Sequence, residues 1–243
     1  MESPAAYVSI GDSMSIDLYP FLELSQADPG VSNNVGASSL LYRNNASLWP
    51  EFQRQDLCTS HPDIRYFCLA EDGATTFDFL DPDVLKLLNG HQKAPMIVTI
   101  TLGGNDILQL INRPENQLSA DFDNLFERYD RFIDLVANML PRAICILSSI
   151  YDPTDGSGVL PGHDSFKERL VWLHRMNEHI EICSRGINAL FADVHKHFLG
   201  HGLSAPADQR WYWAPNPIEP SARGASEIRR LWLDALRSLE IVP

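Results

Sequence analysis

Hydrophobic residues gather in five short, continuous runs along the chain. They cover residues 5–10, 64–70, 96–102, 143–150 and 189–194. The runs do not alternate between apolar and polar positions, as the strands of a sheet with one solvated face would. Continuous runs of this length are typical of strands that helices cover on both faces. The pattern therefore predicts a five-stranded, buried parallel sheet.

Between these runs, apolar residues recur at three- and four-residue spacing, which is typical of amphipathic helices. The spacing predicts helices over residues 76–88, 119–140, 164–186 and 220–239. Strands that alternate with helices indicate an α/β fold with right-handed crossovers. Because no internal repeat or interdomain linker interrupts the pattern, residues 1–243 are expected to form a single domain.

Three long segments fall outside both patterns and are expected to be irregular. They cover residues 17–63, 151–163 and 200–219, and they are rich in Gly, Pro, Asn and Ser. Each follows the carboxyl end of an expected strand, the edge at which open α/β sheets bind their ligands. Long connections of this kind are uncommon without a function, so the sequence predicts a binding or catalytic site along this edge.

Composition narrows the classes of function. The net charge of −13 argues against nucleic acid and against an anionic membrane surface as partners. The four cysteines show no metal-binding spacing, and no stretch has the length and apolarity of a membrane helix. No signal-like segment precedes the first strand. We therefore expect a cytoplasmic protein with reduced cysteines and no zinc site.

The first strand ends in the stretch "IGDSMS", which places Ser13 at the carboxyl edge of the sheet. Gly11 permits a tight turn there, and a hydroxyl on a rigid turn that faces a cleft suits a nucleophile. An ordinary turn in which Asp12 or Ser13 caps a helix explains the same residues. This stretch alone does not decide between the two interpretations.

Two further segments follow later strands. "EDGATTFDFL" puts Gly73 between the second strand and a helix, where a turn glycine is common. "TLGGNDIL" puts Asn105 on a glycine turn directly after the third strand. The amide of such an asparagine can donate a hydrogen bond to an oxyanion.

Taken in this order, each after a strand, the three segments resemble the SGNH (GDSL-type) hydrolase family. The resemblance runs from Tyr7 to the C-terminal helix. It implies a flavodoxin-like, three-layer α/β/α sandwich with strand order 2-1-3-4-5. It also implies that Ser13 is the nucleophile, and that the backbone of Ser13, the backbone of Gly73 and the side chain of Asn105 form the oxyanion hole.

The end of the chain departs from the family pattern. SGNH hydrolases usually carry Asp-x-x-His-Pro before the last helix, with the histidine as general base and the aspartate orienting it. The matching text here is "NPIEPSARGASEIRRLW", in which Glu219 stands at the histidine position and Asn216 at the aspartate position. Neither residue inherits the usual role by position alone.

Three explanations of this departure are open. A histidine from another loop can act as the base, with Glu219 orienting it; His201 is the first choice, and His163, His195 and His197 are the others. Glu219 can itself deprotonate Ser13, provided that burial raises its pKa above the usual ~4.3. Finally, the protein can have lost hydrolysis while keeping the pocket.

The expected function is that of a serine esterase or acylhydrolase that cleaves a small ester through an acyl-enzyme on Ser13. In this hypothesis His201 transfers the proton, Glu219 orients His201, and no metal or organic cofactor is implied. The alternative is a non-catalytic protein of the same fold that binds a small ligand. Assisted proton transfer is worth ~10²–10⁴-fold in rate, so the identity of the base decides between the two.

Overall fold

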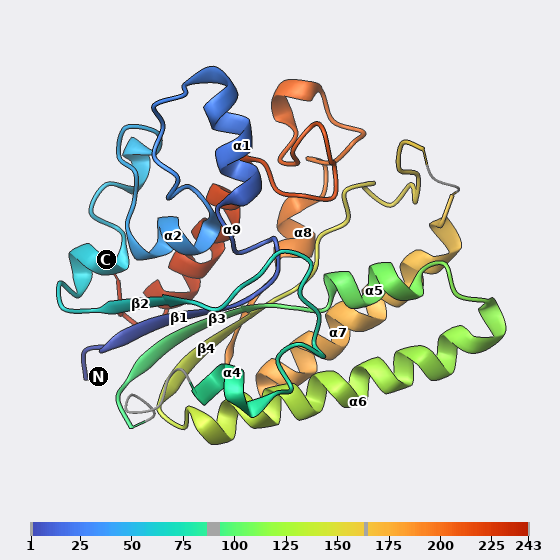
Figure 1. Ribbon diagram of the computed structural model, residues 1–243, viewed down its shortest axis with the longest axis horizontal. Helices are drawn as coiled ribbons and strands as arrows, with labels where there is room; N and C mark the ends of the chain where they lie inside the picture. Colours follow the sequence, from blue (N-terminus) through green and yellow to red (C-terminus); the bar gives the residue numbers. More distant parts are fainter. Residues whose placement is uncertain (1, 87–92, 163–164, 243) are drawn as a thin grey trace.

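The computed structural model describes residues 2–86, 93–162 and 165–242 (Figure 1). Its centre is a parallel sheet of five strands in the order β2-β1-β3-β4-β5. The strands are β1 (Ala6–Gly11), β2 (Arg65–Cys68), β3 (Met96–Thr101), β4 (Ala143–Ser148) and β5 (Leu190–Ala192). Each falls inside or within one residue of an apolar run, so the predicted strands and their order are confirmed.

The helices are α1 (Leu18–Ala27), α2 (Ala37–Tyr42), α3 (Leu57–Ser60), α4 (Pro82–Lys86), α5 (Gly104–Leu110), α6 (Glu115–Met139), α7 (Leu170–Gly186), α8 (Val194–Phe198) and α9 (Ala222–Arg237). The three longest, α6, α7 and α9, confirm the helices expected from apolar spacing. In the part of the chain that the structure describes, no helix combines the length and apolarity needed to cross a membrane.

Two expectations about local structure are wrong. Of the helix expected over residues 76–88, only α4 is present. The Thr75 N–H and hydroxyl donate hydrogen bonds to the Asp78 carboxylate, which makes a turn before the helix. Pro82 then begins α4, because proline is tolerated at the first position of a helix. Leu87 and Leu88 lie outside the described residues. The segment 17–63, expected to be irregular, contains α1, α2 and α3.

The sheet lies between two layers of helices, which Figure 1 shows above and below it. Successive residues of a strand point to opposite faces. Val8 and Val98 therefore pack with α6 and α7 in one apolar cluster, and Tyr7 and Ile97 pack with α9 in the other. The expected three-layer α/β/α arrangement follows from this two-sided burial.

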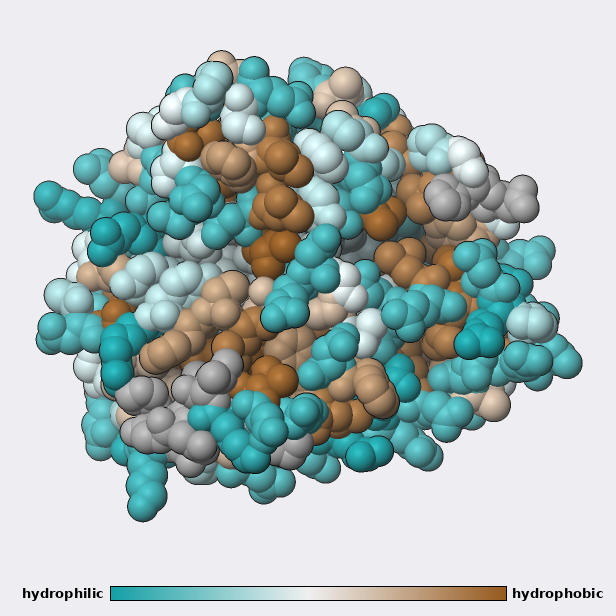
Figure 2. Space-filling model, viewed as in Figure 1, coloured by the Kyte–Doolittle hydropathy of each residue, from teal (hydrophilic) through white to brown (hydrophobic). Residues whose placement is uncertain are grey.

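Most of the face in Figure 2 is hydrophilic, in keeping with the net charge of −13. Apolar surface is nevertheless visible over α1, where Leu18 and Leu22 are 42% and 37% exposed. Exposed apolar side chains are common on folded proteins, so these residues alone assign no function to this surface.

The carboxyl end of β1 depends on a very close approach to β3. A Cβ atom on Gly11 would lie 2.1 Å from Thr101 Oγ1 and 2.9 Å from the Thr101 carbonyl oxygen. The backbone N–H of Asp12 donates to that same carbonyl at 3.0 Å. Glycine at position 11 therefore allows β1 to end against β3 and fixes where Ser13 begins.

We expect Gly11→Ala to destabilise the protein by about 1–3 kcal/mol, because the added methyl group has no room beside Thr101. Gly186→Ala, at the end of α7 with nothing within 4 Å of the added carbon, is the matched control. Its expected effect is between zero and a gain of ~1 kcal/mol. Urea unfolding measures both, and equal stabilities for the two variants would contradict the packing argument.

Candidate active site

A cavity of about 1140 Å³ opens at the carboxyl edge of the sheet. Asp12 and Ser13 line it after β1, Gly104 and Asn105 line it after β3, and Glu219 lines it from the loop before α9. Strands β1 and β3 are neighbours at the point where the strand order reverses, which is the usual ligand site of open α/β sheets. The fold therefore brings together Ser13, Asn105 and Glu219, three of the five site residues predicted from the sequence.

Ser13 and Glu219 interact directly. The side chains of Ser13 and Glu219 line the same cavity, and the Ser13 hydroxyl acts on the Glu219 carboxyl as a hydrogen-bond donor that lowers its pKa. Oε2 of that carboxyl is buried without a partner among the described residues. Burial raises the pKa of Glu219 to about 7; the nearby charge of Asp72 raises it as well, and the hydrogen bond from Ser13 lowers it. Loss of hydration outweighs the hydrogen bond, so this carboxyl takes up a proton near neutrality.

The loop that carries Glu219 is closed by backbone hydrogen bonds. The N–H of Trp213 donates to the carbonyl of Glu219 at 2.8 Å, and the N–H of Glu219 donates to the carbonyl of Asn216 at 3.0 Å. The Tyr151 hydroxyl holds the same loop by donating to the carbonyl of Ile218 at 2.8 Å. Asn216 thus shapes the turn that presents Glu219.

A second group of side chains, Tyr19, Asp72 and Trp213, lies beside Glu219. The Tyr19 hydroxyl donates to both carboxylate oxygens of Asp72, at 3.0 and 3.1 Å, and the Tyr19 ring lies 5.3 Å from that of Trp213. These contacts link α1, the loop after β2 and the loop before α9. Asp72 directly precedes Gly73, but nothing in its own sequence context marks it.

The expected oxyanion donors are partly assembled. Asn105 lines the cavity, and its Nδ2 donates one hydrogen bond to the carbonyl of Ala74 at 2.9 Å, which leaves its second N–H for a ligand. The backbone N–H groups of Ser13 and Gly73 make no hydrogen bond within the described residues. Gly73 has a φ of +74° and faces open space, but it is not among the residues that line the cavity.

A buried network, which no local sequence pattern indicates, holds the segments of Gly73 and Asn105 together. Asp106 accepts hydrogen bonds from the Thr76 N–H at 2.9 Å and the Thr76 hydroxyl at 2.7 Å. Arg128 of α6 donates to the same carboxylate at 2.8 Å. Since Asp106 directly follows Asn105, this ion pair sets the position of the Asn105 amide.

Asp12 is a second buried carboxyl in the same cavity. Its Oδ1 accepts a hydrogen bond from the N–H of Met14 at 3.0 Å, which makes a turn after β1. Burial raises the pKa of Asp12 to about 7, and the charge of Glu219 contributes to the increase. Two carboxyls therefore change charge in one pH range inside one cavity.

The histidines that the sequence offers as bases make other contacts. The His201 ring is stacked 3.6 Å from the Trp211 ring, and its Nδ1 lies 2.9 Å from the carbonyl of Gln209. His195 Nδ1 lies 3.1 Å from the Ile150 carbonyl, and His197 Nε2 lies 3.0 Å from Glu227. None of these three lines the cavity.

The arrangement expected at the sequence level, in which His201 links Ser13 to Glu219, is therefore not the one in the structure. Glu219 contacts Ser13 itself, and His201 packs in the loop core with Trp211. His163 lies outside the described residues. Asn216 and Glu219 occupy neighbouring positions of one turn, and no described histidine lies between Glu219 and Ser13 in the cavity lining.

Metal-ligand side chains come together elsewhere. Within residues 2–86, 93–162 and 165–242, the one group of three that could hold an ion is Asp130, His179 and Cys183. None of the three lines the cavity beside Ser13.

Residues 31–226 match the model of the GDSL-like Lipase/Acylhydrolase family. The chain therefore belongs to this family, as its three segments indicated. The matched range includes Gly73, Asn105 and Glu219 and begins after Ser13. No curated protein matches the chain.

Solved structures share the fold at low sequence identity. The extracellular lipase of Streptomyces rimosus is 21% identical, with a TM-score of 0.60 over 96% of this chain and 99% of that one. Phospholipase A1 of Streptomyces albidoflavus is 19% identical, with a TM-score of 0.58 over 97% and 99%. A catalytic mutant of an acetylxylan esterase from Geobacillus stearothermophilus is 18% identical, with a TM-score of 0.59 over 97% and 95%.

The burial of Glu219 predicts a pH-dependent stability difference. Its pKa rises from 4.5 to about 7 on folding, so the folded protein binds the proton more tightly and loses stability as pH increases through this window. Relative to Glu219→Gln, we expect the natural protein to lose ~1–3 kcal/mol between about pH 5 and pH 8.

Urea unfolding at both pH values measures this difference. Glu71→Gln, which removes the same charge from an exposed position, is the control and is expected to show no comparable trend. A parallel pH dependence in all three proteins would mean that the Glu219 carboxyl is hydrated in the folded state.

Proposed function

We propose that this protein is a serine esterase or acylhydrolase in which Glu219, rather than a histidine, is the general base for Ser13. One observation carries the proposal: Ser13 lines the same cavity as Glu219, a carboxyl on which the Ser13 hydroxyl acts and whose pKa burial raises to about 7. An ordinary glutamate, with a pKa near ~4.3, is a weak base for a hydroxyl. The burial of Glu219 gives it a proton affinity close to that of the imidazole that the family usually places there.

In the proposed acylation step, Ser13 Oγ attacks the carbonyl carbon of an ester while its proton passes to Glu219. The carbonyl oxygen gains the negative charge of the tetrahedral intermediate. As the intermediate collapses, the ester C–O bond breaks, and protonated Glu219 gives its proton to the departing alcohol. A water molecule then repeats the sequence on the acyl-enzyme, releases the acid and restores Ser13.

The negative oxygen of the intermediate is proposed to receive hydrogen bonds from the N–H groups of Ser13 and Gly73 and from the Asn105 amide. The free N–H groups of the first two and the unused donor of the third support this assignment. Each donor of this kind is worth ~10²–10³-fold in kcat. The ion pair between Asp106 and Arg128 keeps the Asn105 segment in place while charge develops.

The cavity also suggests which acyl groups fit. Beyond Ser13 and Asn105 its lining combines polar residues such as Asn112, Arg169 and Arg210 with a set of apolar side chains: Ile107, Leu108, Ile111, Phe166, Leu170 and Leu173. Its volume of about 1140 Å³ exceeds what an acetyl group needs. We therefore propose an ester whose acyl group is an apolar chain.

Nitrophenyl ester hydrolysis tests the roles of Ser13 and Glu219. Ser13→Ala is expected to abolish turnover, and Glu219→Gln is expected to lower kcat/KM by ~10²–10⁴-fold. His201→Ala and His163→Ala are matched histidine variants, and both are expected to keep most of the activity. A collapse in either histidine variant, with activity retained in Glu219→Gln, would assign the base to that histidine.

The dependence of kcat/KM on pH shows which of the two buried carboxyls, Glu219 or Asp12, is the base. Since the deprotonated carboxylate is the active form, kcat/KM is expected to rise with pH through an apparent pKa of about 7. Asp12→Asn distinguishes the two buried carboxyls and should keep this limb, whereas Glu219→Gln should remove it. Failure of a fluorophosphonate to label Ser13 would instead favour the binding protein without catalysis.

Leu173→Trp tests the acyl site. The larger side chain would fill the apolar wall, so hydrolysis of nitrophenyl octanoate should fall at least ~10-fold relative to that of nitrophenyl acetate. Val171→Trp, an exposed position on the same helix, is the control and should leave the ratio unchanged. An unchanged ratio in Leu173→Trp would place the acyl chain elsewhere.

A further inference from the structure

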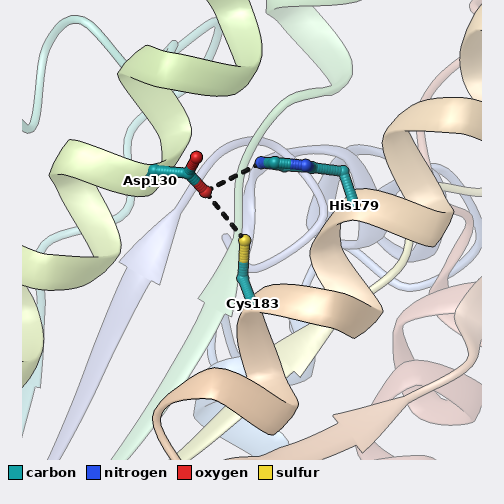
Figure 3. Close-up of side chains that lie close together, drawn as sticks. All are labelled: Asp130, His179 and Cys183. Atoms are coloured by element: carbon teal, nitrogen blue, oxygen red, sulfur yellow. Dashed lines mark hydrogen bonds and ion pairs between the residues drawn. The ribbon is translucent and has the colours of Figure 1, made fainter.

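Three potential metal ligands lie together where helices α6 and α7 pack against each other (Figure 3). His179 and Cys183 stand one helical turn apart on α7 and point toward Asp130 on α6. The Asp130 Oδ1 atom lies 2.9 Å from His179 Nε2 and 3.2 Å from Cys183 Sγ. All three ligand atoms lie within 4.8 Å of one another.

The packing of the two helices fixes His179 and Cys183 before any ion binds. The His179 ring is stacked 4.7 Å from the ring of Phe126 and lies edge-on to that of Tyr129 at 6.2 Å. Cys183 is buried on the inner side of α7. Pairs of residues one turn apart on a helix share a face, so the nitrogen and the sulfur are presented to the same point.

Two of the three separations, those from Asp130 to His179 and to Cys183, lie close to the spacing of ligand atoms around Zn²⁺. Zn²⁺ binds sulfur at ~2.3 Å and nitrogen or oxygen at ~2.0–2.2 Å, which places ligand atoms ~3.3–3.8 Å apart around a tetrahedral centre. The oxygen to nitrogen and oxygen to sulfur separations here are shorter by a few tenths of an ångström. Asp130 is 52% exposed on its side chain, so it is free to move outward by this amount.

The set of donors points to the same class of metal. One imidazole nitrogen, one thiolate and one carboxylate oxygen form a mixed set that suits borderline-soft Zn²⁺ or Co²⁺ better than Mg²⁺ or Ca²⁺, which take oxygen ligands. The charges of the thiolate and the carboxylate together balance a divalent ion. The protein as a whole is acidic, which favours the approach of a cation.

We propose that Asp130, His179 and Cys183 form a binding site for Zn²⁺ that joins α6 to α7 and leaves a fourth position for water. Binding converts the Cys183 thiol to a thiolate and releases its proton to solvent. The site uses none of the residues around Ser13. It stabilises the fold rather than taking part in ester hydrolysis.

The place of the site in the fold gives binding a structural consequence. Leu170 and Leu173 of the same helix line the cavity beside Ser13, and Met176 packs against the turn of Gly103. An ion that ties α7 to α6 therefore holds one wall of that cavity against the rest of the layer. Anything that binds only the folded state raises its stability by mass action.

Titration of the metal-free full chain with Co²⁺ and Zn²⁺ tests the proposal. One equivalent of Co²⁺ is expected to produce the charge-transfer absorption of a cobalt–thiolate bond, and Zn²⁺ is expected to displace it. At a free Zn²⁺ concentration ~100 times Kd, the midpoint of thermal unfolding should rise by roughly 5–10 °C.

Two variants remove single ligands and one is a matched control. Cys183→Ser keeps a donor for Asp130 but loses the thiolate, and His179→Gln loses the imidazole; both should lose the absorption and the thermal shift. Cys68→Ser removes an exposed thiol on β2 and should retain both. Absence of stoichiometric binding in the natural chain, or a cobalt–thiolate band that survives in Cys183→Ser, would overturn the proposal.

Discussion

The Glu219 carboxyl is held out of water beside the Ser13 hydroxyl, and the rest of the site is arranged around this unfavourable placement. Burial alone makes the ionised carboxylate costly. The hydrogen bond from Ser13 offsets only part of that cost, and the pKa stays near 7. Backbone hydrogen bonds within the loop from Trp211 to Ser221 keep Glu219 in this position. These bonds are made whether or not the carboxyl is charged.

The sheet positions Ser13 and Asn105, but the other parts of the site lie on loops. Strand ends fix where Ser13 and Asn105 emerge, since Gly11 lets β1 finish against Thr101 and the helix α5 begins directly after β3. The loops that finish the site are tied together by side chains. Asp106 joins Thr76 to Arg128, so the segments after β2 and β3 are held to α6 as one unit.

The fold could be predicted from the sequence because buried strands appear as continuous apolar runs. The positions of Ser13 and Asn105 could be predicted because glycines mark the turns after β1 and β3. The contacts of Glu219 and His201 could not, because both lie on irregular loops whose paths depend on distant partners. His201 is held by Trp211, and Glu219 is held by a turn at Asn216. The buried Asp106 also escaped notice, since its partner Arg128 lies on another helix and no local pattern pairs them.

The ring of Tyr19 against Trp213 and its hydroxyl on Asp72 join α1 to the loops after β2 and before α9. Should these loops part, water would reach the carboxyl and its proton affinity would fall toward that of a free glutamate. The pKa of Glu219 thus depends on whether these segments stay in contact. In the proposed mechanism, Glu219 is therefore a strong enough base only while these contacts exclude water from it.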